Sequence, residues 1–228
     1  MPAPQSIKKV VDRIKCKTLV INEIFYSIQG ESTRTGLPTA FIRLTGCPLR
    51  CRYCDTAYAF HEGGKMTIGD ILHAIAGYRT RYVTVTGGEP LAQRACIDLL
   101  GLLCDEGYQV SLETGGALDI SAVDERVCRI LDIKTPGSGE AGKNRYANLS
   151  HLTPADQIKF VICDRDDYEW ARGKLRALQL NERCEVLFSP SHDELPAEAL
   201  ADWILADQLP VRLQVQLHKY LWGDVRGR

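Results

Sequence analysis

The sequence predicts an α/β fold, an incomplete TIM-like barrel of about six parallel β/α units. Short β-branched runs alternate with segments of helical period along most of the chain, which is typical of a parallel sheet. Polar, glycine-rich segments follow these runs, and parallel folds place ligands at the carboxyl ends of their strands. The units are fewer than the eight of a closed barrel, so periodicity alone leaves an open sheet as the alternative.

The expected strands are short runs rich in β-branched and apolar residues. They are Ala40–Leu44, Tyr82–Thr86, Gln109–Leu112, Ile130–Ile133, Gln157–Ile162, Glu185–Phe188 and Val211–Leu217. The segments TGCPLRC, TGGEP, ETGG, DIKTPGSG, FSPS and LHK lie at the ends of these strands. Because the carboxyl ends of parallel strands share one edge, we expect these segments to form one functional face.

The helices are predicted from apolar spacing and from residues typical of helix ends. The spacing i, i+3, i+4, i+7 is followed by Ile68, Ile71, Leu72 and Ile75. Thr67 is placed to cap this helix. Pro90 suits the first turn of a helix through Leu91, Leu99, Leu102 and Leu103, with Gly107 at its C-terminal cap. Later helices are expected at Asp167–Leu180 and around Leu200, Trp203 and Ile204, with Asp164–Glu169 as a solvated helix start.

Length and composition set broad limits on the class of protein. With 228 residues and 45% apolar content, residues 1–228 are expected to form a single domain with its own core. The formal net charge of -1 gives no reason to expect binding to nucleic acid or to an anionic membrane. No apolar run approaches the roughly 20 residues of a membrane span, and the first 17 residues do not resemble a signal peptide. We therefore expect a cytoplasmic protein.

The nine cysteines are unevenly distributed. Six are scattered and are expected to be inert thiols: Cys16, Cys96, Cys104, Cys128, Cys163 and Cys184. The other three, Cys47, Cys51 and Cys54, form a C-x3-C-x2-C motif on a predicted loop. Three thiolates suit a [4Fe–4S] cluster that leaves one iron open to a small molecule. The alternatives are reduced cysteines without a metal, or a zinc site that adds His61 as a fourth ligand.

This spacing resembles the hallmark of the radical S-adenosylmethionine superfamily. Tyr53 matches the aromatic position that packs near adenine in that superfamily. The segment TGGEP, residues 86–90, resembles the glycine-rich segment that contacts the methionine amino group. Gly87 and Gly88 permit close backbone approach, and either motif alone would be a weaker signal than both in this order. The resemblance implies S-adenosylmethionine as a cofactor and radical chemistry on a substrate.

Within the superfamily, the sequence is similar to 7-carboxy-7-deazaguanine synthase over nearly its whole length. The matching segments are NEIFYSIQGE (residues 22–31), FIRL (41–44), CDT (54–56), ET (113–114) and QLHK (216–219). Ser32 stands where that family usually has glycine. The resemblance implies a lyase of queuosine and 7-deazapurine biosynthesis. Such a lyase converts 6-carboxy-5,6,7,8-tetrahydropterin to 7-carboxy-7-deazaguanine, with ring contraction and release of ammonia. It also implies family-specific N- and C-terminal segments around the radical domain.

The resemblance carries family roles onto matching residues of this chain. Substrate contacts are implied for Ile28, Gln29, Gly30, Glu31, Arg43, Thr86 and His218. Cofactor contacts are implied for Arg52, Tyr53, Cys54, Asp55, Gly88, Asp132, Ile133, Lys134, Ser189 and Pro190. The cluster ligands would be Cys47, Cys51 and Cys54, and Thr56 would bind Mg²⁺. Residue chemistry is compatible with this, since arginine binds carboxylates bidentately, although Arg43 alone would read as an ordinary strand arginine. No catalytic side chain is singled out, because the cofactor generates the substrate radical.

Two other functions share some of these features. A glycyl-radical-enzyme activase has a similar length and cysteine motif but acts on a protein, and the YSIQGE and QLHK segments favour the pterin enzyme. A zinc or iron–sulfur electron-transfer module would need no pocket, which TGGEP and the crowded strand ends argue against. By resemblance, the expected partners are the pterin, an electron donor such as flavodoxin, and a second copy in a homodimer.

Overall fold

The computed structural model describes residues 5–228, and nine strands of this part form one continuous sheet. The strands are β1 (Thr18–Ile28), β2 (Pro38–Leu44), β3 (Gly64–Thr67), β4 (Tyr82–Gly87), β5 (Gln109–Thr114), β6 (Cys128–Asp132), β7 (Gln157–Ile162), β8 (Glu185–Pro190) and β9 (Arg212–Leu213). Their order is β3-β1-β2-β4-β5-β6-β7-β8-β9. Every pair from β2 to β9 is parallel, whereas β1 pairs antiparallel with β2 and β3.

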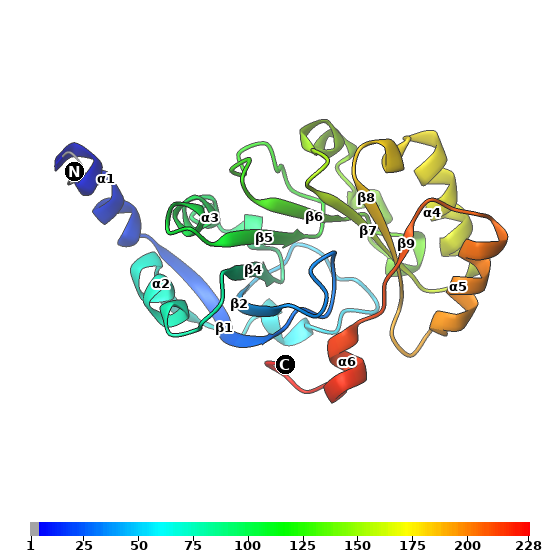
Figure 1. The fold of residues 1–228 in the computed structure, drawn as a ribbon, viewed down its shortest axis with the longest axis horizontal. Coiled ribbons are helices and arrows are strands. Elements are labelled where there is room, and N and C mark those ends of the chain that lie inside the picture. The colour runs from blue at the N-terminus through cyan, green and yellow to red at the C-terminus, as the bar shows by residue number, and fades with distance from the viewer. Residues whose placement is uncertain (1–4) are drawn as a thin grey trace.

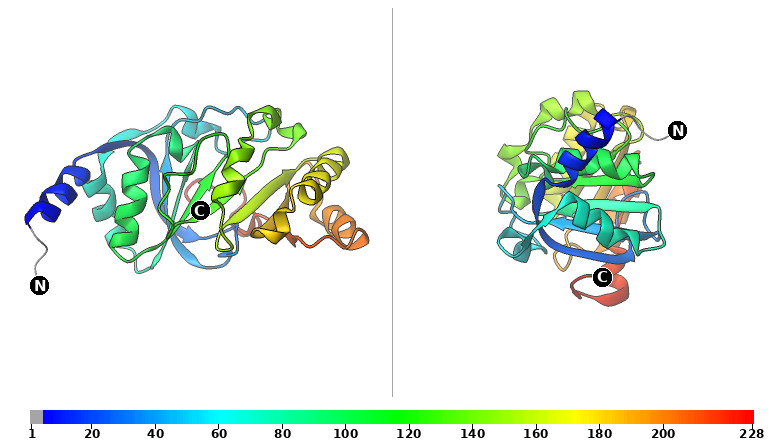
Figure 2. Two further views of the ribbon diagram at one scale, coloured as in Figure 1. Left: turned by 90° about the horizontal axis from the view of Figure 1, so that it is seen from above. Right: turned by 90° about the vertical axis from the view of Figure 1, so that its left-hand side faces the viewer.

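The sheet has two edges, β3 and β9, so the barrel is incomplete. The six strands β2, β4, β5, β6, β7 and β8 supply the expected units, and the curved sheet carries the helices between these strands on its outside (Figure 1). This confirms the predicted partial barrel. The helices are α1 (Gln5–Lys15), α2 (Ile68–Ala76), α3 (Cys96–Asp105), α4 (Arg165–Ala177), α5 (Ala197–Ala206) and α6 (Leu217–Trp222). Figure 2 shows α1 projecting away from the other helices.

The helix ends agree with the sequence prediction where a nearby side chain pairs with the backbone N–H groups of the first turn. Thr67 caps α2 as predicted: its hydroxyl accepts from the Asp70 backbone N–H, and the Asp70 carboxylate accepts from the Thr67 N–H. The helix predicted from Pro90 is interrupted, because a short 3₁₀ turn (Pro90–Ala92) precedes α3. Gly107 does follow α3 with a positive φ of 87°.

Alternating side chains of the parallel strands divide between the outer core and the interior of the barrel. In β7, Ile158, Phe160 and Ile162 are fully buried in the apolar core under the helices. Lys159 and Val161 point the other way and line a cavity. Because successive side chains of a strand point to opposite faces, each of these strands contributes to both the hydrophobic core and the polar surface of the cavity.

Three sequence predictions need correction. The strands β1 and β3 were not predicted. The run Val211–Leu217 is a strand only at Arg212–Leu213, and α6 begins at Leu217, so His218 and Lys219 lie on a helix. The acidic start of α4 is not wholly solvated. Asp167 is buried there and accepts hydrogen bonds from Thr135 Oγ1 and the Gly137 N–H.

Within residues 5–228, no helix has the length and apolarity needed to cross a bilayer. The expectation about a signal peptide includes residues 1–4, which lie outside the described residues.

Candidate active site

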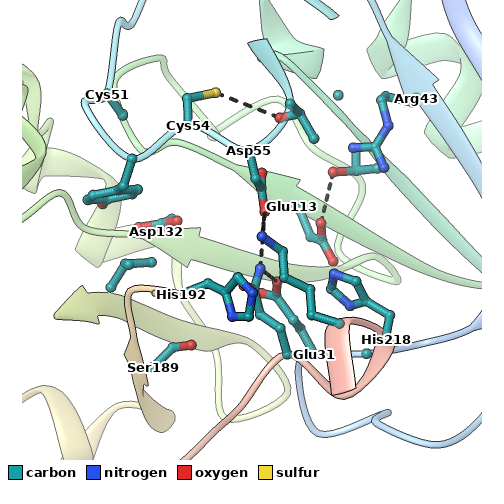
Figure 3. Close-up of a pocket in the computed structure, with 18 of the residues that line it drawn as sticks. Glu31, Arg43, Cys51, Cys54, Asp55, Glu113, Asp132, Ser189, His192 and His218 are labelled. Carbon is teal, nitrogen blue, oxygen red and sulfur yellow. Dashed lines mark hydrogen bonds and ion pairs between the residues drawn. The ribbon is translucent and has the colours of Figure 1, made fainter. Parts of the chain in front are cut away.

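A cavity of about 570 Å³ opens at the carboxyl ends of the parallel strands (Figure 3). Its walls come from β1, β2 and the cysteine loop, from the ends of β4 to β8, and from α6 with the chain beyond it. This volume falls within the range of small-molecule sites. The predicted common face of the strand ends is therefore a single pocket.

The cysteine loop follows β2 and brings Cys47, Cys51 and Cys54 to one side of this pocket. Burial is the main reason that the pKa of the Cys47 thiol is raised and that of Cys51 is raised to about 11, while nearby Lys134 lowers both. Metals bind the thiolate form, which burial disfavours here. A bound metal ion would therefore have to stabilise the deprotonated cysteines. The loop thus provides three free thiols beside a fixed positive charge.

The spacing of the three thiols fits a cluster better than one metal ion. Within residues 5–228, the sulfur atoms of these three cysteines do not all lie within 4.8 Å of one another. A single tetrahedral zinc, with Zn–S near 2.3 Å, would bring its thiolates to about 3.8 Å apart. His61, the fourth ligand of the zinc alternative, is exposed and does not line the pocket.

Gly87 and Gly88 allow β4 to pack against the cysteine loop. Gly87 has a φ of 150°, and a Cβ there would lie 2.2 Å from the Leu44 carbonyl oxygen. A Cβ at Gly88 would lie 2.3 Å from the Gly46 carbonyl oxygen and 2.9 Å from Cys47 Cβ. Larger residues would therefore displace the loop that carries the thiols.

The buried carboxylate of Glu89 connects the loops that follow β4 and β5. Its carboxylate is fully buried and accepts from the Leu91 and Gly115 N–H groups at 3.0 and 2.7 Å and from Thr114 Oγ1 at 2.9 Å. Burial raises the pKa of Glu89, although these donors act in the opposite direction. In this structure, Glu89 joins the loops after β4 and β5.

The pocket wall formed by β6 has polar atoms without a protein partner. The Lys134 ammonium lies 3.0 Å from Asp132 Oδ2 and 5.8 Å from the centre of the Tyr53 ring. Among the described residues, Asp132 Oδ1 and the Tyr53 hydroxyl are buried and have no hydrogen-bond partner. Buried polar groups are normally paired, so these two atoms fit a ligand that carries hydroxyl or amino groups.

The opposite part of the pocket is built from side-chain amides and carboxylates. Gln29 Nε2 donates to Thr84 Oγ1 at 3.1 Å and to Glu113 Oε1 at 3.4 Å, and Thr86 Oγ1 donates to Glu113 Oε2 at 2.8 Å. Burial, followed by the charge of Glu31, raises the pKa of Glu113. Such donors and acceptors match the amide and amine edge of a pterin ring.

Arg43 on β2 presents a cationic group to the same part of the pocket. Its Nε donates to Glu23 Oε1 at 2.8 Å. Within residues 5–228, its two terminal nitrogens have no hydrogen-bond partner. They remain available for bidentate binding of a carboxylate.

His218 lies directly against Gly30. A Cβ at residue 30 would meet His218 Nδ1 at 2.0 Å, and the Leu217 N–H donates to the Gly30 carbonyl at 3.0 Å. Burial lowers the pKa of His218, which favours the neutral imidazole. The first turn of α6 is thus held against the SIQGE segment (residues 27–31). His218 therefore lies on a helix and not at the strand end that the sequence predicted.

Of the residues predicted for the site, all but two line the pocket. The Arg52 side chain points outward to Glu194, and Ile133 is buried in the apolar core because it alternates with Asp132 and Lys134. Sequence reasoning missed the roles of Glu23, Tyr58 and Lys159. The signal for Lys159 was a lysine in the middle of the apolar strand QIKFVI.

The chain after α6 covers part of the pocket mouth. Arg226 stacks on the Tyr58 ring at 4.0 Å and pairs with Glu62 Oε2 at 2.7 Å and Glu23 Oε2 at 3.4 Å. Its Nη2 also donates to Asn22 Oδ1 at 3.0 Å. These contacts tie the C-terminal tail, residues 223–228, to β1 and to the segment after the cysteine loop.

Three clustered thiols after the first parallel strand and a Gly-Gly-Glu turn after the next define a radical S-adenosylmethionine enzyme. Residues 41–183 match the Radical SAM superfamily, so the chain uses S-adenosylmethionine and a [4Fe–4S] cluster. It is 46% identical to 7-carboxy-7-deazaguanine synthase of Chlorobaculum tepidum, over 92% of this chain and 97% of the relative. It is 44% identical to that of Koribacter versatilis, over 89% of this chain and 96% of the relative. The chain belongs to the 7-carboxy-7-deazaguanine synthase family.

Solved structures agree on the fold. QueE from Escherichia coli superposes with a TM-score of 0.76 at 24% identity, covering 91% of this chain and 98% of that one. Streptococcus suis SuiB bound to S-adenosylmethionine gives a TM-score of 0.54 at 15% identity over 75% of this chain and 48% of that one. The match along nearly the whole QueE chain confirms the open radical enzyme fold.

Proposed function

We propose that this pocket converts 6-carboxy-5,6,7,8-tetrahydropterin to 7-carboxy-7-deazaguanine, with ring contraction and release of ammonia, for queuosine and related 7-deazapurines. The observation that carries the proposal is the division of a single pocket. Three thiols and Asp132, whose Oδ1 has no hydrogen-bond partner among the described residues, face one part of it, and Arg43 with a set of amides and carboxylates faces the other. The family supplies the reaction, and the pocket supplies groups of the right chemistry. The relatives favour this reading over an activase.

In the cofactor half, Cys47, Cys51 and Cys54 would hold the [4Fe–4S] cluster. When bound, the reduced cluster and S-adenosylmethionine supply a carbon radical that removes a hydrogen atom from the substrate. Asp132 Oδ1 would accept from the ribose hydroxyls of the cofactor, and Tyr53, which lies beside Lys134, would pack near its adenine. The remaining cofactor contacts are assigned to Asp55, Gly88, Ser189 and Pro190, and to Arg52 and Ile133, whose side chains lie outside the pocket.

In the substrate half, Arg43 would bind the pterin carboxylate through its two terminal nitrogens. The amide and amine edge of the ring would meet Gln29 and Glu31, with Glu113 beside them. The other contacts are assigned to Ile28, Gly30, Thr86 and His218. These groups bind and orient the ring, while the walls of the pocket exclude water from the radical.

Thr56 is the proposed ligand of Mg²⁺. It caps a 3₁₀ turn (Ala57–Phe60), its Oγ1 lies 3.8 Å from Cys54 Sγ, and it lines the pocket. Magnesium prefers oxygen ligands and keeps several waters, so substrate oxygens would have to complete its shell. Thr56→Ala should reduce the stimulation of turnover by Mg²⁺. Equal stimulation in the variant and the parent would contradict this assignment.

The setting of the reaction is part of the same proposal. All nine cysteines are free thiols in the structure, which supports a reducing cytoplasmic compartment. We infer that residues 1–228 act as one radical domain with family-specific terminal segments. We further infer that it works as a homodimer and takes electrons from a flavodoxin.

The test is an anaerobic assay of the reconstituted protein with dithionite, S-adenosylmethionine and 6-carboxy-5,6,7,8-tetrahydropterin. Formation of 7-carboxy-7-deazaguanine with release of ammonia is the expected result. Iron content should fall on Cys47→Ala, Cys51→Ala or Cys54→Ala, but not on Cys104→Ala, which lies away from the pocket. Turnover of a protein substrate alone would support the activase instead.

A further inference from the structure

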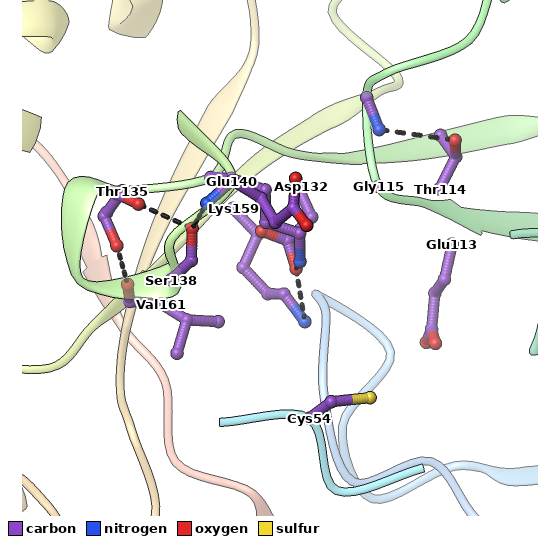
Figure 4. A network of polar contacts seen from close by, with 12 residues as sticks. Cys54, Glu113, Thr114, Gly115, Asp132, Thr135, Ser138, Glu140, Lys159 and Val161 are labelled. Carbon is purple, nitrogen blue, oxygen red and sulfur yellow. Dashed lines mark hydrogen bonds and ion pairs between the residues drawn. The ribbon is translucent and has the colours of Figure 1, made fainter. Parts of the chain in front are cut away.

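Lys159 occupies a position where a lysine is costly. It lies in the middle of β7 between the buried Ile158 and Phe160, and its side chain is only 14% exposed. Its ammonium group lies 2.6 Å from Glu31 Oε2. It also lies 3.6 Å from Asp132 Oδ2 (Figure 4). A buried lysine is retained only with charged partners, and this one has two.

The two carboxylates belong to different halves of the pocket. Glu31 comes from the segment after β1, and its other oxygen accepts from Gln216 Nε2 at 2.9 Å. Asp132 ends β6 and also pairs with Lys134, while its Oδ1 is buried and has no partner within residues 5–228. Glu31 therefore faces the proposed pterin site, and Asp132 faces the proposed cofactor site (Figure 3).

We propose that Lys159 is a positioning residue that holds Glu31 and Asp132 together and thereby couples binding of the pterin to binding of S-adenosylmethionine. The inference rests on the proposed function, because that function assigns the two halves. A ligand that donates a hydrogen bond to one carboxylate changes how strongly Lys159 is held by the other. Binding at either site would then preorganise the opposite wall, and the coupling must be reciprocal.

Lys159 is suited to positioning rather than to proton transfer. Burial alone would lower its pKa, but the charges of Glu31, Asp132 and Glu113 together raise it above its ordinary value. The ammonium group therefore keeps its proton at neutral pH. A group that holds its proton so firmly is a poor general acid, whereas its fixed charge can orient two carboxylates at once.

The experiment measures the dissociation constant of the pterin with and without saturating S-adenosylmethionine, by calorimetry on the oxidised holoenzyme, in which no turnover occurs. In the parent we expect S-adenosylmethionine to tighten pterin binding at least about fivefold. Lys159→Met should reduce this ratio to about one and weaken both ligands about tenfold or more. Lys159→Arg, which keeps the charge, should retain most of the coupling. The matched control is Lys65→Met, on an exposed residue of β3 outside the pocket.

A pH profile distinguishes this role from general support of the fold. Burial would raise the pKa of Glu31, but the ammonium group of Lys159 holds this pKa well below its ordinary value. Gln216 and His218 act in the same direction. The acidic groups nearby are Glu113 and Asp132. Pterin binding by the parent should therefore not respond to Glu31 between pH 5 and 8. In Lys159→Met the pKa of Glu31 should rise, so pterin affinity should weaken as the pH falls through this range.

The outcomes separate the two proposals. If the parent binds S-adenosylmethionine but not the pterin, the proposed function fails and the coupling fails with it. If the pterin binds but the ratio in Lys159→Met equals that of the parent, only the role of Lys159 is overturned. Should Lys159→Met not fold, the double variant E31Q/K159M removes one charge of each sign, and a parental ratio in it would also overturn the role.

Discussion

Glu23 and Arg43 form an ion pair between neighbouring antiparallel strands, with Arg43 Nε 2.8 Å from Glu23 Oε1. Both side chains are more than four-fifths buried, and the Tyr58 hydroxyl donates to the same oxygen of Glu23 at 3.0 Å. The pair fixes one edge of the guanidinium and turns the other edge toward the pocket. This geometry supports the proposal that Arg43 binds the carboxylate of the substrate.

Arg43→Lys should weaken binding of the pterin carboxylate, because lysine keeps the charge but cannot bind Glu23 and a carboxylate in fork geometry. We expect KM for the pterin to rise about 10- to 100-fold, as loss of a charge-assisted hydrogen bond would predict, with a smaller effect on kcat. Steady-state kinetics check this, with Arg126→Lys at an exposed site as the control. A parental KM in Arg43→Lys would place the carboxylate elsewhere.

Gly30→Ala should displace His218, because the new Cβ would lie 2.0 Å from its Nδ1 and 3.0 Å from its backbone nitrogen. Overpacking of this kind costs about 1–3 kcal/mol, so we expect weaker pterin binding and a lower melting temperature. Gly142→Ala is the matched control, since nothing lies within 4 Å of a Cβ there. If both variants bind the pterin equally well, the contact between Gly30 and His218 does not shape the site.

Much of the fold and the centre of the site could be predicted because their signals are local. The cysteine spacing, the glycine turn and the Thr67 cap all depend on residues close together in sequence. The strand β1 was missed because its residues were interpreted only as a motif, although the run TLVINEIFYSI is rich in strand formers. The local composition therefore predicts this strand. Its antiparallel pairing with β2 and β3 depends on residues far apart in sequence and could not be predicted in the same way.

Long-range contacts explain the other differences. Val211–Leu217 has the composition of a strand, but Gln214 leaves the sheet and binds the Ser32 backbone through its side-chain amide. This tertiary contact overrides local propensity and allows α6 to begin at Leu217. The pair of Lys159 with Glu31 joins residues 128 positions apart, which no periodicity could reveal.

His218 should make stability depend on pH in a defined direction. Burial lowers its pKa below the ordinary 6.5, so below that pH the unfolded chain binds a proton that the folded protein does not. This contribution to the free energy of unfolding therefore decreases as the pH falls from above 6.5 toward the folded pKa. We expect the melting temperature of the parent to fall more than that of His218→Asn between pH 7 and pH 5, by on the order of 1 °C. Parallel pH profiles for the two proteins would contradict the lowered pKa.

Arg226→Ala should loosen the C-terminal tail over the pocket. Its guanidinium stacks on Tyr58 and contacts Glu62, and it shares the Glu23 carboxylate with Arg43, so removal frees the tail and one side of that ion pair. Because Arg226 lies at the surface, we expect little change in melting temperature. We expect a higher KM for the pterin and more cofactor cleaved per product formed, since an open pocket admits water and holds the substrate less firmly. Arg228→Ala, which removes a contact with Trp222 but none of the contacts to β1, is the control. If Arg226→Ala keeps both the parental KM and the parental ratio of cleaved cofactor to product, the tail does not contribute to closing the site.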